Sequence, residues 1–148
     1  MGVTHRNTFV GLSIAILATA ALAWAQVSGQ ESRESGGAVY ELRTYTTHPG
    51  RLEALHARFR DHTMRLFEKH EIQNVTYWTP LREDGSAGEE TLVYVQKHKS
   101  LEAARRSWQG FRNDPEWQTA KAASEADGPI VKKVESVYLK PTDYSPHR

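Results

Sequence analysis

Hydrophobic and polar residues alternate along residues 38–46 in the way that a β-strand requires. Successive side chains of a strand point to opposite faces, so Glu41, Arg43 and Tyr45 share one face. The even-numbered positions share the other face and are more apolar. Such a strand fits a sheet with one solvent-exposed face, but it also fits a sheet whose charged face is enclosed within a larger structure.

The rest of the chain shows two periodicities, about two residues for strands and about 3.6 for helices. Proline, glycine and capping residues divide the periodic segments, and Asp84–Gly85 marks a hairpin between the second and third strands. The predicted elements are, in order, a strand at 38–46, a helix from Gly50 to His70, strands at 72–81 and 91–97, a helix capped by Ser100, a helix from Asp114–Pro115 to Gly128–Pro129, and a strand at 130–140.

This β-α-β-β-α-α-β order predicts an α+β fold, a ferredoxin-like subunit with a four-stranded antiparallel sheet and helices on one face. The other face is bare. Whichever way the second and third strands are phased, either Trp78 or Tyr77, and either Tyr94 or the pair Val93 and Val95, must point away from the helices. An uncovered apolar face is an association surface. We therefore predict a homodimer, pairing into a dimeric α+β barrel in which the charged face of the first strand lines a space between two sheets.

Residues 1–25 have the pattern of a secretory signal peptide. A short polar start with Arg6 and no acidic residue precedes an apolar run, which ends in an A-x-A cleavage signal at Ala23–Trp24–Ala25. The run is shorter than the roughly 20 apolar residues that span a bilayer. We therefore expect cleavage after Ala25 and a secreted or periplasmic protein without a membrane anchor.

The composition, with 39% hydrophobic and 25% charged residues, is that of one globular domain. We place this domain at 38–140, after a polar flexible linker at 26–37 and before a C-terminal tail at 141–148. Without Arg6 the chain has 18 basic residues (19 minus 1) and 18 acidic residues, and no block of like charge. Neither a nucleic acid nor a membrane surface is therefore expected as a partner. There are no cysteines, so stability must come from a packed core, which a second subunit would complete.

Four segments taken together resemble the NIPSNAP family of the dimeric α+β barrel superfamily. They are YELRTYTTHPGRL (40–52), VTYWT (75–79), LVYVQKHKSLEAARRSW (92–108) and NDPEWQ (113–118). The similarity covers essentially all of residues 38–140, and the order and spacing of the segments are its most specific feature. The resemblance implies a ferredoxin-like subunit and a barrel of two subunits. The superfamily includes cofactor-independent monooxygenases, haem-degrading enzymes and haem peroxidase relatives, but there is no NIPSNAP catalytic motif to carry over.

The histidines do not predict a metal site. Along the predicted helix, His56 and His62 point roughly 240° apart, and His62 and His70 lie about 12 Å apart along the axis. The chain also has no HExxH motif and no cysteine. His62 lies on the apolar stripe of the helix, as a core histidine, a proton-transfer group of a pocket, or an axial haem ligand. His98 is expected at a solvated strand end.

Glu41 and Arg43 lie about 7 Å apart along one strand face. They fit an ion-pair network, with each other or with Lys133 and Glu135, and they also fit recognition of a ligand carboxylate. The candidates for lining the pocket are Glu41, Arg43, Tyr45, His62, Trp78 and Tyr94.

Two classes of function fit these residues. The first is a homodimeric small-molecule-binding or interaction module whose barrel cavity holds a small hydrophobic or amphipathic ligand. The second is an enzyme of the cofactor-independent monooxygenase or haem-handling type, in which Tyr45, His62 or Arg43 supply proton transfer and charge stabilisation. The first is favoured, because no nucleophile–base pair, phosphate loop or metal set is visible. The sequence requires no cofactor, and haem is the one that the resemblance suggests.

Overall fold

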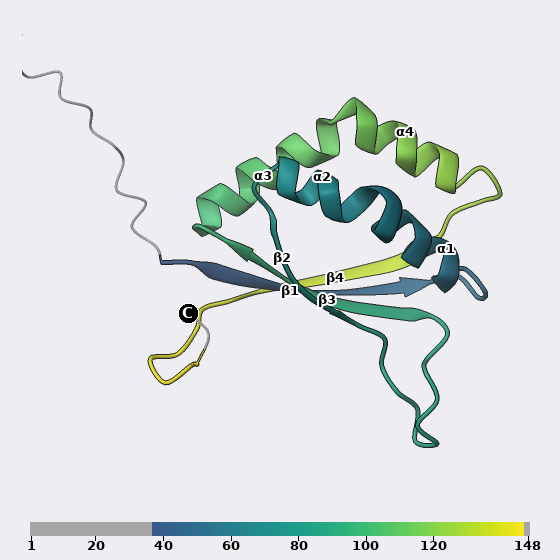
Figure 1. Ribbon diagram of the computed structural model, residues 1–148, viewed down its shortest axis with the longest axis horizontal. Coiled ribbons are helices and arrows are strands. Elements are labelled where there is room, and N and C mark those ends of the chain that lie inside the picture. The colour runs from purple at the N-terminus through teal and green to yellow at the C-terminus, as the bar shows by residue number, and fades with distance from the viewer. Residues whose placement is uncertain (1–36, 147–148) are drawn as a thin grey trace, which may run out of the picture. The chain divides into compact units, whose positions relative to one another are not determined.

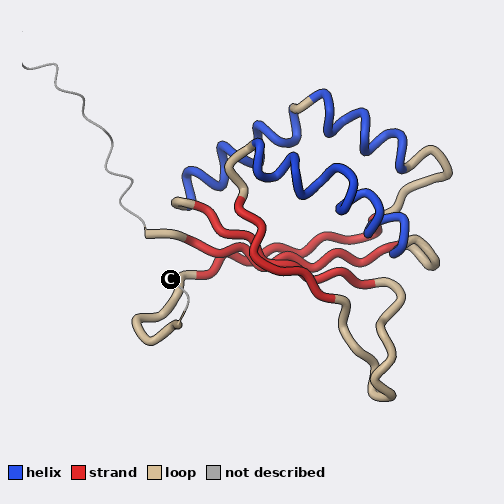
Figure 2. The backbone as a smooth tube through the Cα atoms, in the orientation of Figure 1, coloured by secondary structure: helices blue, strands red, loops and turns tan. Residues whose placement is uncertain are grey.

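Four strands and a layer of helices form the part of the protein that the structure describes, residues 37–146 of a computed structural model (Figures 1 and 2). The strands are β1 (Val39–Thr47), β2 (Gln73–Trp78), β3 (Thr91–His98) and β4 (Val131–Leu139). They form one antiparallel sheet in the order β2-β3-β1-β4, and the helices lie on one face of it (Figure 1). The ferredoxin-like α+β fold expected from the sequence is confirmed.

The helices follow the predicted order with changed boundaries. They are α1 (Leu52–Arg58), a π-helical turn η1 (Phe59–Thr63), α2 (Met64–Lys69), α3 (Leu101–Asn113) and α4 (Pro115–Ser124). Gly50 has a φ of 72°, a left-handed conformation that favours glycine, and it turns the chain between β1 and α1. α4 ends at Ser124, before the predicted end at Gly128.

The π-helical turn changes which residues of the first helix face the core. Thr63 donates its hydroxyl to the backbone oxygen of Arg58, five residues earlier, at 3.1 Å. The wider turn rotates the following residues about the helix axis, so Thr63 and Leu66 are buried and His62 is exposed. The prediction that His62 lies on the apolar stripe was wrong, because it assumed an unbroken period of 3.6 residues.

The starts of α3 and α4 follow the capping signals in the sequence. The Ser100 hydroxyl accepts a hydrogen bond from the backbone N–H of Ala103 at 3.1 Å. Asp114 Oδ1 accepts one from the backbone N–H of Glu116 at 2.9 Å, with Pro115 in the first turn of α4. Each side chain satisfies a backbone donor that the helix leaves unpaired, so both predicted helix starts are confirmed.

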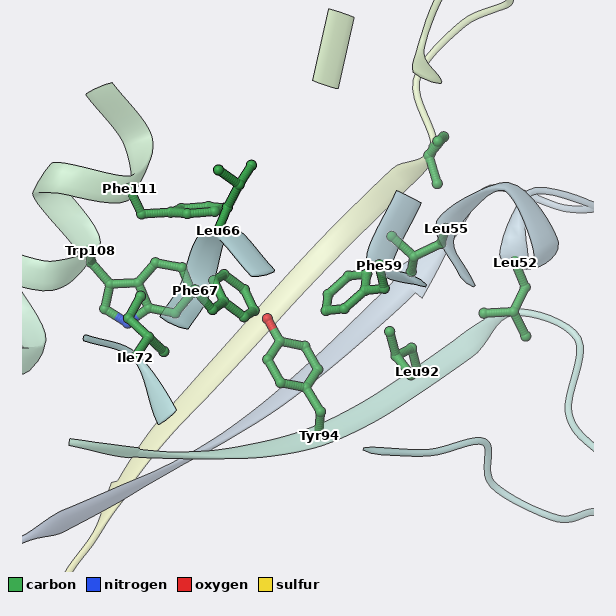
Figure 3. Close-up of a cluster of buried hydrophobic side chains, with 11 residues drawn as sticks. Leu52, Leu55, Phe59, Leu66, Phe67, Ile72, Leu92, Tyr94, Trp108 and Phe111 are labelled. Atoms are coloured by element: carbon green, nitrogen blue, oxygen red, sulfur yellow. The ribbon is translucent and has the colours of Figure 1, made fainter. Parts of the chain in front are cut away.

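The core lies between the sheet and the helices. The side chains of β2 and β3 show which face of these strands belongs to it. Tyr77 and Tyr94 point toward the helices, whereas Trp78, Val93 and Val95 point to the uncovered side. Figure 3 shows the buried cluster, with Tyr94 rising from β3 into the space beneath the helices. The most completely buried members are Leu55, Leu66, Phe67, Ile72, Tyr94 and Ile130.

Within residues 37–146, no helix is long and apolar enough to cross a membrane. The predicted signal peptide at 1–25 and all but the last residue of the linker at 26–37 lie outside the described part of the chain.

Candidate functional site

A buried carboxylate on the central strand β1 gathers four side-chain donors. Glu41 is 1% exposed, and its Oε2 accepts hydrogen bonds from Nε2 of His98 at 3.0 Å and Nε1 of Trp108 at 2.6 Å. Its Oε1 accepts from Nη1 of Arg43 and from the hydroxyl of Ser136, both at 2.6 Å. β1, β3, β4 and α3 therefore meet at a single side chain.

These contacts keep Glu41 ionised. Burial alone would raise the pKa of the carboxyl, but the hydrogen bonds from His98, Ser136 and Trp108 and the charge of Arg43 outweigh it and lower the pKa to about 2. Burial would likewise lower the pKa of Arg43, yet the oxygens of Tyr45 and Tyr94 and the Glu41 carboxylate raise it above its ordinary value. The two groups form a buried ion pair.

The charged face of β1 points toward the helices. Glu41 contacts Trp108 of α3, and Tyr45 packs edge to face on Phe59 of η1, with ring centroids 6.1 Å apart. The prediction that this face lines a space between two sheets was therefore wrong. It is enclosed by the helices of its own chain, because the buried alternate positions of β3 place the helix side on the same face as Glu41.

Arg43 links the carboxylate cluster to a group of buried phenols. Its guanidinium lies 4.2 Å from the ring centroid of Trp108, and Nη2 donates to the hydroxyl of Tyr45 at 3.4 Å. The ring of Tyr45 lies 5.3 Å from that of Tyr94, which stacks on Tyr77 at 5.3 Å. Burial raises the pKa of Tyr94 well above its ordinary value, so its phenol is protonated at neutral pH.

The hydroxyl of Tyr94 has no hydrogen-bond partner within residues 37–146, although the side chain is fully buried. In Figure 3 the oxygen is directed at the helix layer, between Phe59 and Phe67. A buried polar group without a partner is uncommon in folded proteins, so its position requires an explanation. Both neighbouring phenylalanines line the cleft described next.

A cleft of about 330 Å³ lies between η1, α4 and the start of β4. Five of its lining side chains are aromatic, and these are Tyr45, Phe59, Phe67, Phe111 and Trp117. Phe111 and Trp117 are neighbours across the α3–α4 corner, with ring centroids 4.5 Å apart. The volume falls at the lower end of the range for sites that hold small organic molecules.

Arg58 brings a positive charge into the wall of this cleft. The side chain is buried, with Nη1 donating to Glu125 Oε1 at 3.0 Å and to the hydroxyl of Ser124 at 3.3 Å. Its guanidinium lies 5.4 Å from the ring centroid of Trp117. The π-helical turn that follows Arg58 directs both Phe59 and Thr63 into the same cleft.

A larger hollow, of about 490 Å³, lies between α1 and the β2–β3 loop. It is more open to solvent than the aromatic cleft, and its polar lining includes Glu53, Glu89 and Glu90. Because the aromatic cleft is the more enclosed of the two, it is the better candidate for a binding site.

Four of the six residues predicted for the pocket lie together, and the other two lie elsewhere. Glu41, Arg43, Tyr45 and Tyr94 lie together beneath the helices. The other two lie apart from them: Trp78 is 50% exposed on the uncovered face, and His62 is exposed on the outer side of the first helix.

Three partners of Glu41 were missed from the sequence. His98 is 2% exposed and was predicted at a solvated strand end, so that prediction was wrong. Strand alternation was the available signal, since His98 lies on the same face of β3 as Tyr94. Trp108 was not among the predicted site residues, and Ser136 carried no signal at all.

The structure separates His62, the suggested axial haem ligand, from the cleft. Within residues 37–146, no three histidine or acidic side chains come close enough to hold a metal ion. The side chains that line the cleft include no histidine or methionine, and the suggested axial ligand His62 is on the solvent side. His62 therefore cannot act as an axial ligand in this cleft.

The NIPSNAP family model matches residues 40–146. The chain belongs to the NIPSNAP family. Among solved structures it is similar to a NIPSNAP-like domain protein from Burkholderia xenovorans, with 18% identity, 75% of this chain and 90% of that chain covered, and a TM-score of 0.62. It is also similar to a NIPSNAP family protein of unknown function from Agrobacterium tumefaciens, with 22% identity, 76% and 95% covered, and a TM-score of 0.61.

A third similar structure is SnoaB, a cofactor-independent oxygenase from Streptomyces nogalater, with 16% identity, 74% and 98% covered, and a TM-score of 0.48. No curated protein matches the sequence. At these identities the NIPSNAP structures support the fold alone, and the function has to be argued from this chain's own residues.

Proposed function

We propose that this NIPSNAP protein is an exported homodimer that binds a small hydrophobic or amphipathic molecule in the aromatic cleft of each subunit. The observation that carries the proposal is the cavity of about 330 Å³, which is lined in part by Phe59 and Phe67, the two rings that flank the unpartnered hydroxyl of Tyr94 (Figure 3). An apolar pocket with a few converging polar groups is the usual form of a small-molecule site. The ligand position differs from the sequence-based expectation, since the cleft lies under the helices and not between two sheets.

The uncovered face of the sheet supports the homodimer. Leu42 of β1 lies between Val95 of β3 and Val137 of β4, and Tyr40 pairs with Leu139. The β2–β3 loop and the C-terminal tail extend on this side of the sheet, at opposite ends of the face (Figure 1). A second copy of this face would cover the apolar side chains between these two segments.

The homodimer is tested by light scattering on the chain that starts after Ala25. The wild type should have the mass of two copies at micromolar concentration. Val137→Asp, on the uncovered face, should give single copies, because a carboxylate would be buried without a partner. Val134→Asp, on the helix side of the same strand, should remain a dimer. A single-copy mass for the wild type would contradict the proposal.

Ligand binding is tested with N-phenyl-1-naphthylamine, an uncharged probe whose fluorescence rises in apolar sites. The wild type should bind it with saturation at one molecule per subunit. Val134 lines the cleft, so Val134→Trp should fill it and abolish this binding. Val137→Trp makes the same change on the opposite face of β4 and should leave binding intact. Equal binding by both variants would mean that the probe does not occupy the cleft.

The alternative proposal is a cofactor-independent monooxygenase that uses the same cleft. It is supported by Tyr45, which lines the cleft with its hydroxyl held by Arg43 and so offers a phenol that would stabilise negative charge on a substrate oxygen. The test is oxygen uptake with an electron-rich phenol such as 1,5-dihydroxynaphthalene. Uptake above the rate without protein, lost in Tyr45→Phe, would favour the enzyme over the binding module.

Export is supported by the signal-peptide pattern of residues 1–25. Mass spectrometry of the protein produced in a bacterial host tests it. We expect a chain beginning at Gln26 in the periplasm or medium, and a full-length chain in the cytoplasm would contradict export.

A further inference from the structure

The charges around the aromatic cleft are not balanced. Its lining contains two cationic side chains, Arg58 and Lys121, and one carboxylate, Glu125. Glu125 lies 3.0 Å from Arg58 and 3.8 Å from Lys121, so both cations share a single acid. The cleft therefore carries one net positive charge.

We propose that the ligand of this cleft is a flat apolar acid, whose anionic group pairs with Arg58 and Lys121 and whose ring system lies against Phe111 and Trp117. This inference rests on the proposed binding function and adds to it the chemical class of the ligand. An anion in this position would complete the charge balance of the cleft lining.

Of the two cations, Arg58 contributes more to binding of the anionic group than Lys121. The residue is 4% exposed, and its Nε has no hydrogen-bond partner within residues 37–146. An arginine buried to this extent needs most of its donors paired, because a buried charge that is incompletely paired is costly. Arginine also presents its N–H groups in a planar fork, which matches a carboxylate or sulfonate.

The aromatic side chains determine the shape of the ligand. Phe111 lies 4.5 Å from Trp117 and 4.8 Å from Phe67 between ring centroids, so three rings follow one another along the wall. Phe59 and Tyr45 also line the cleft, and the ring centroid of Phe59 lies 6.0 Å from that of Phe67 and 6.1 Å from that of Tyr45. Flat conjugated molecules gain most from such a series of rings, because offset stacking and edge contacts add to the burial of apolar area.

Two probes that share one ring system separate shape from charge. 8-Anilinonaphthalene-1-sulfonate is an anion, and N-phenyl-1-naphthylamine is the same ring system without the sulfonate. Fluorescence titration of the wild-type dimer should show about tenfold tighter binding of the anion, as charge-assisted hydrogen bonds to a partly buried site would give. Added salt should weaken the binding of the anion and leave the neutral probe unchanged.

A matched pair of variants tests whether the positive charge that binds the anion lies in the cleft. Lys121 and Lys99 are both half or more exposed, and each pairs with one glutamate, so Lys121→Gln and Lys99→Gln make the same change at two places. Lys121→Gln should weaken binding of the anion about threefold, in line with the modest strength of exposed ion pairs. Lys99→Gln should have no effect, and neither variant should change binding of the neutral probe.

Arg58→Gln should weaken binding of the anion more than Lys121→Gln does, and the Lys121 comparison decides the question if Arg58→Gln fails to fold. Equal affinity of the wild type for the two probes would overturn the inference and leave the binding function standing. An equal loss of affinity for the anion in Lys121→Gln and Lys99→Gln would also overturn the inference and leave the binding function standing. Failure of the wild type to bind either probe would overturn both proposals.

Discussion

The Glu41 cluster makes a quantitative prediction, because replacing the carboxylate by an amide removes the charge and leaves one acceptor oxygen for four donors. Glu41→Gln keeps the size of the side chain and removes the charge. The folded-state pKa of about 2 lies below the ordinary value of 4.5, and at about 1.4 kcal/mol per pH unit this difference corresponds to about 3 kcal/mol. Measured losses on breaking buried ion pairs are roughly 3 to 5 kcal/mol. We therefore expect Glu41→Gln to lower the free energy of unfolding by about 3 kcal/mol at pH 7.

The pH dependence tests the cause of this loss. Because the folded state lowers the pKa of Glu41, the carboxylate contributes its full stability above pH 4.5 and loses it as the pH falls toward 2. The difference between wild type and Glu41→Gln should therefore shrink to about half by pH 3, as expected from a folded-state pKa about one unit lower.

Urea unfolding followed by circular dichroism at pH 7 and pH 3 measures both quantities. Glu71→Gln is the matched control, since Glu71 is an exposed carboxylate between α2 and β2 that pairs with the exposed Lys99 at 3.0 Å. We expect it to change the free energy of unfolding by less than about 0.5 kcal/mol. A loss of less than about 1 kcal/mol in Glu41→Gln at pH 7, or an equal loss at both pH values, would refute the assignment of Glu41 as an ionised, fully paired group.

Three further predictions concern the helices, each measured by urea unfolding. Ser100→Ala should cost about 1 kcal/mol, because the backbone N–H of Ala103 loses its cap, whereas Ser100→Thr should retain most of the stability. A glycine-to-alanine change within a helix usually raises the free energy of unfolding, but Gly110→Ala should lower it, because the new Cβ would lie 3.0 Å from Nδ1 of His70. In a His70→Ala background, Gly110→Ala should raise the free energy of unfolding. Asp114→Ala should destabilise more than Asp114→Asn, which still accepts at the start of α4, and equal effects would exclude the cap as the reason.

The order of elements could be predicted from the sequence because each boundary carries a local signal. Ser100 and Asp114 cap their helices, Gly50 takes a left-handed conformation, and alternation marks β1 and β3. These signals depend on residues close in the chain, so they survive without knowledge of the tertiary structure.

The face of β1 could not be predicted for a physical reason. Each face of this strand has both apolar and polar members, so the alternation alone does not say which face is covered. Glu41 is buried because donors from His98, Trp108 and Ser136 reach it, and these lie 57, 67 and 95 residues away. The pairing of Glu41 with these distant residues leaves no trace in the sequence, even where alternation indicates the buried face of a strand, as at His98.

The π-helical turn was the second feature that could not be predicted from the sequence. Its sequence, residues 59–63, contains no proline or glycine to mark an irregularity, and the stripe of apolar residues continues across it if His62 is counted as apolar. The turn exchanges His62 for Thr63 on the inner side and places Arg58 and Phe59 together at the cleft. π-helical turns occur frequently at functional sites, which agrees with the position of this one.

Arg43 connects the stability of the fold to the proposed function. Its guanidinium is held on one side by Glu41 and on the other donates to Tyr45, which lines the cleft. Loss of the Glu41 charge therefore frees Arg43 to move, and the hydroxyl of Tyr45 loses a fixed partner. The same buried carboxylate that stabilises the sheet thus determines the position of a phenol in the cleft wall, so Glu41→Gln protein that remains folded should bind the neutral probe less tightly than Glu71→Gln protein.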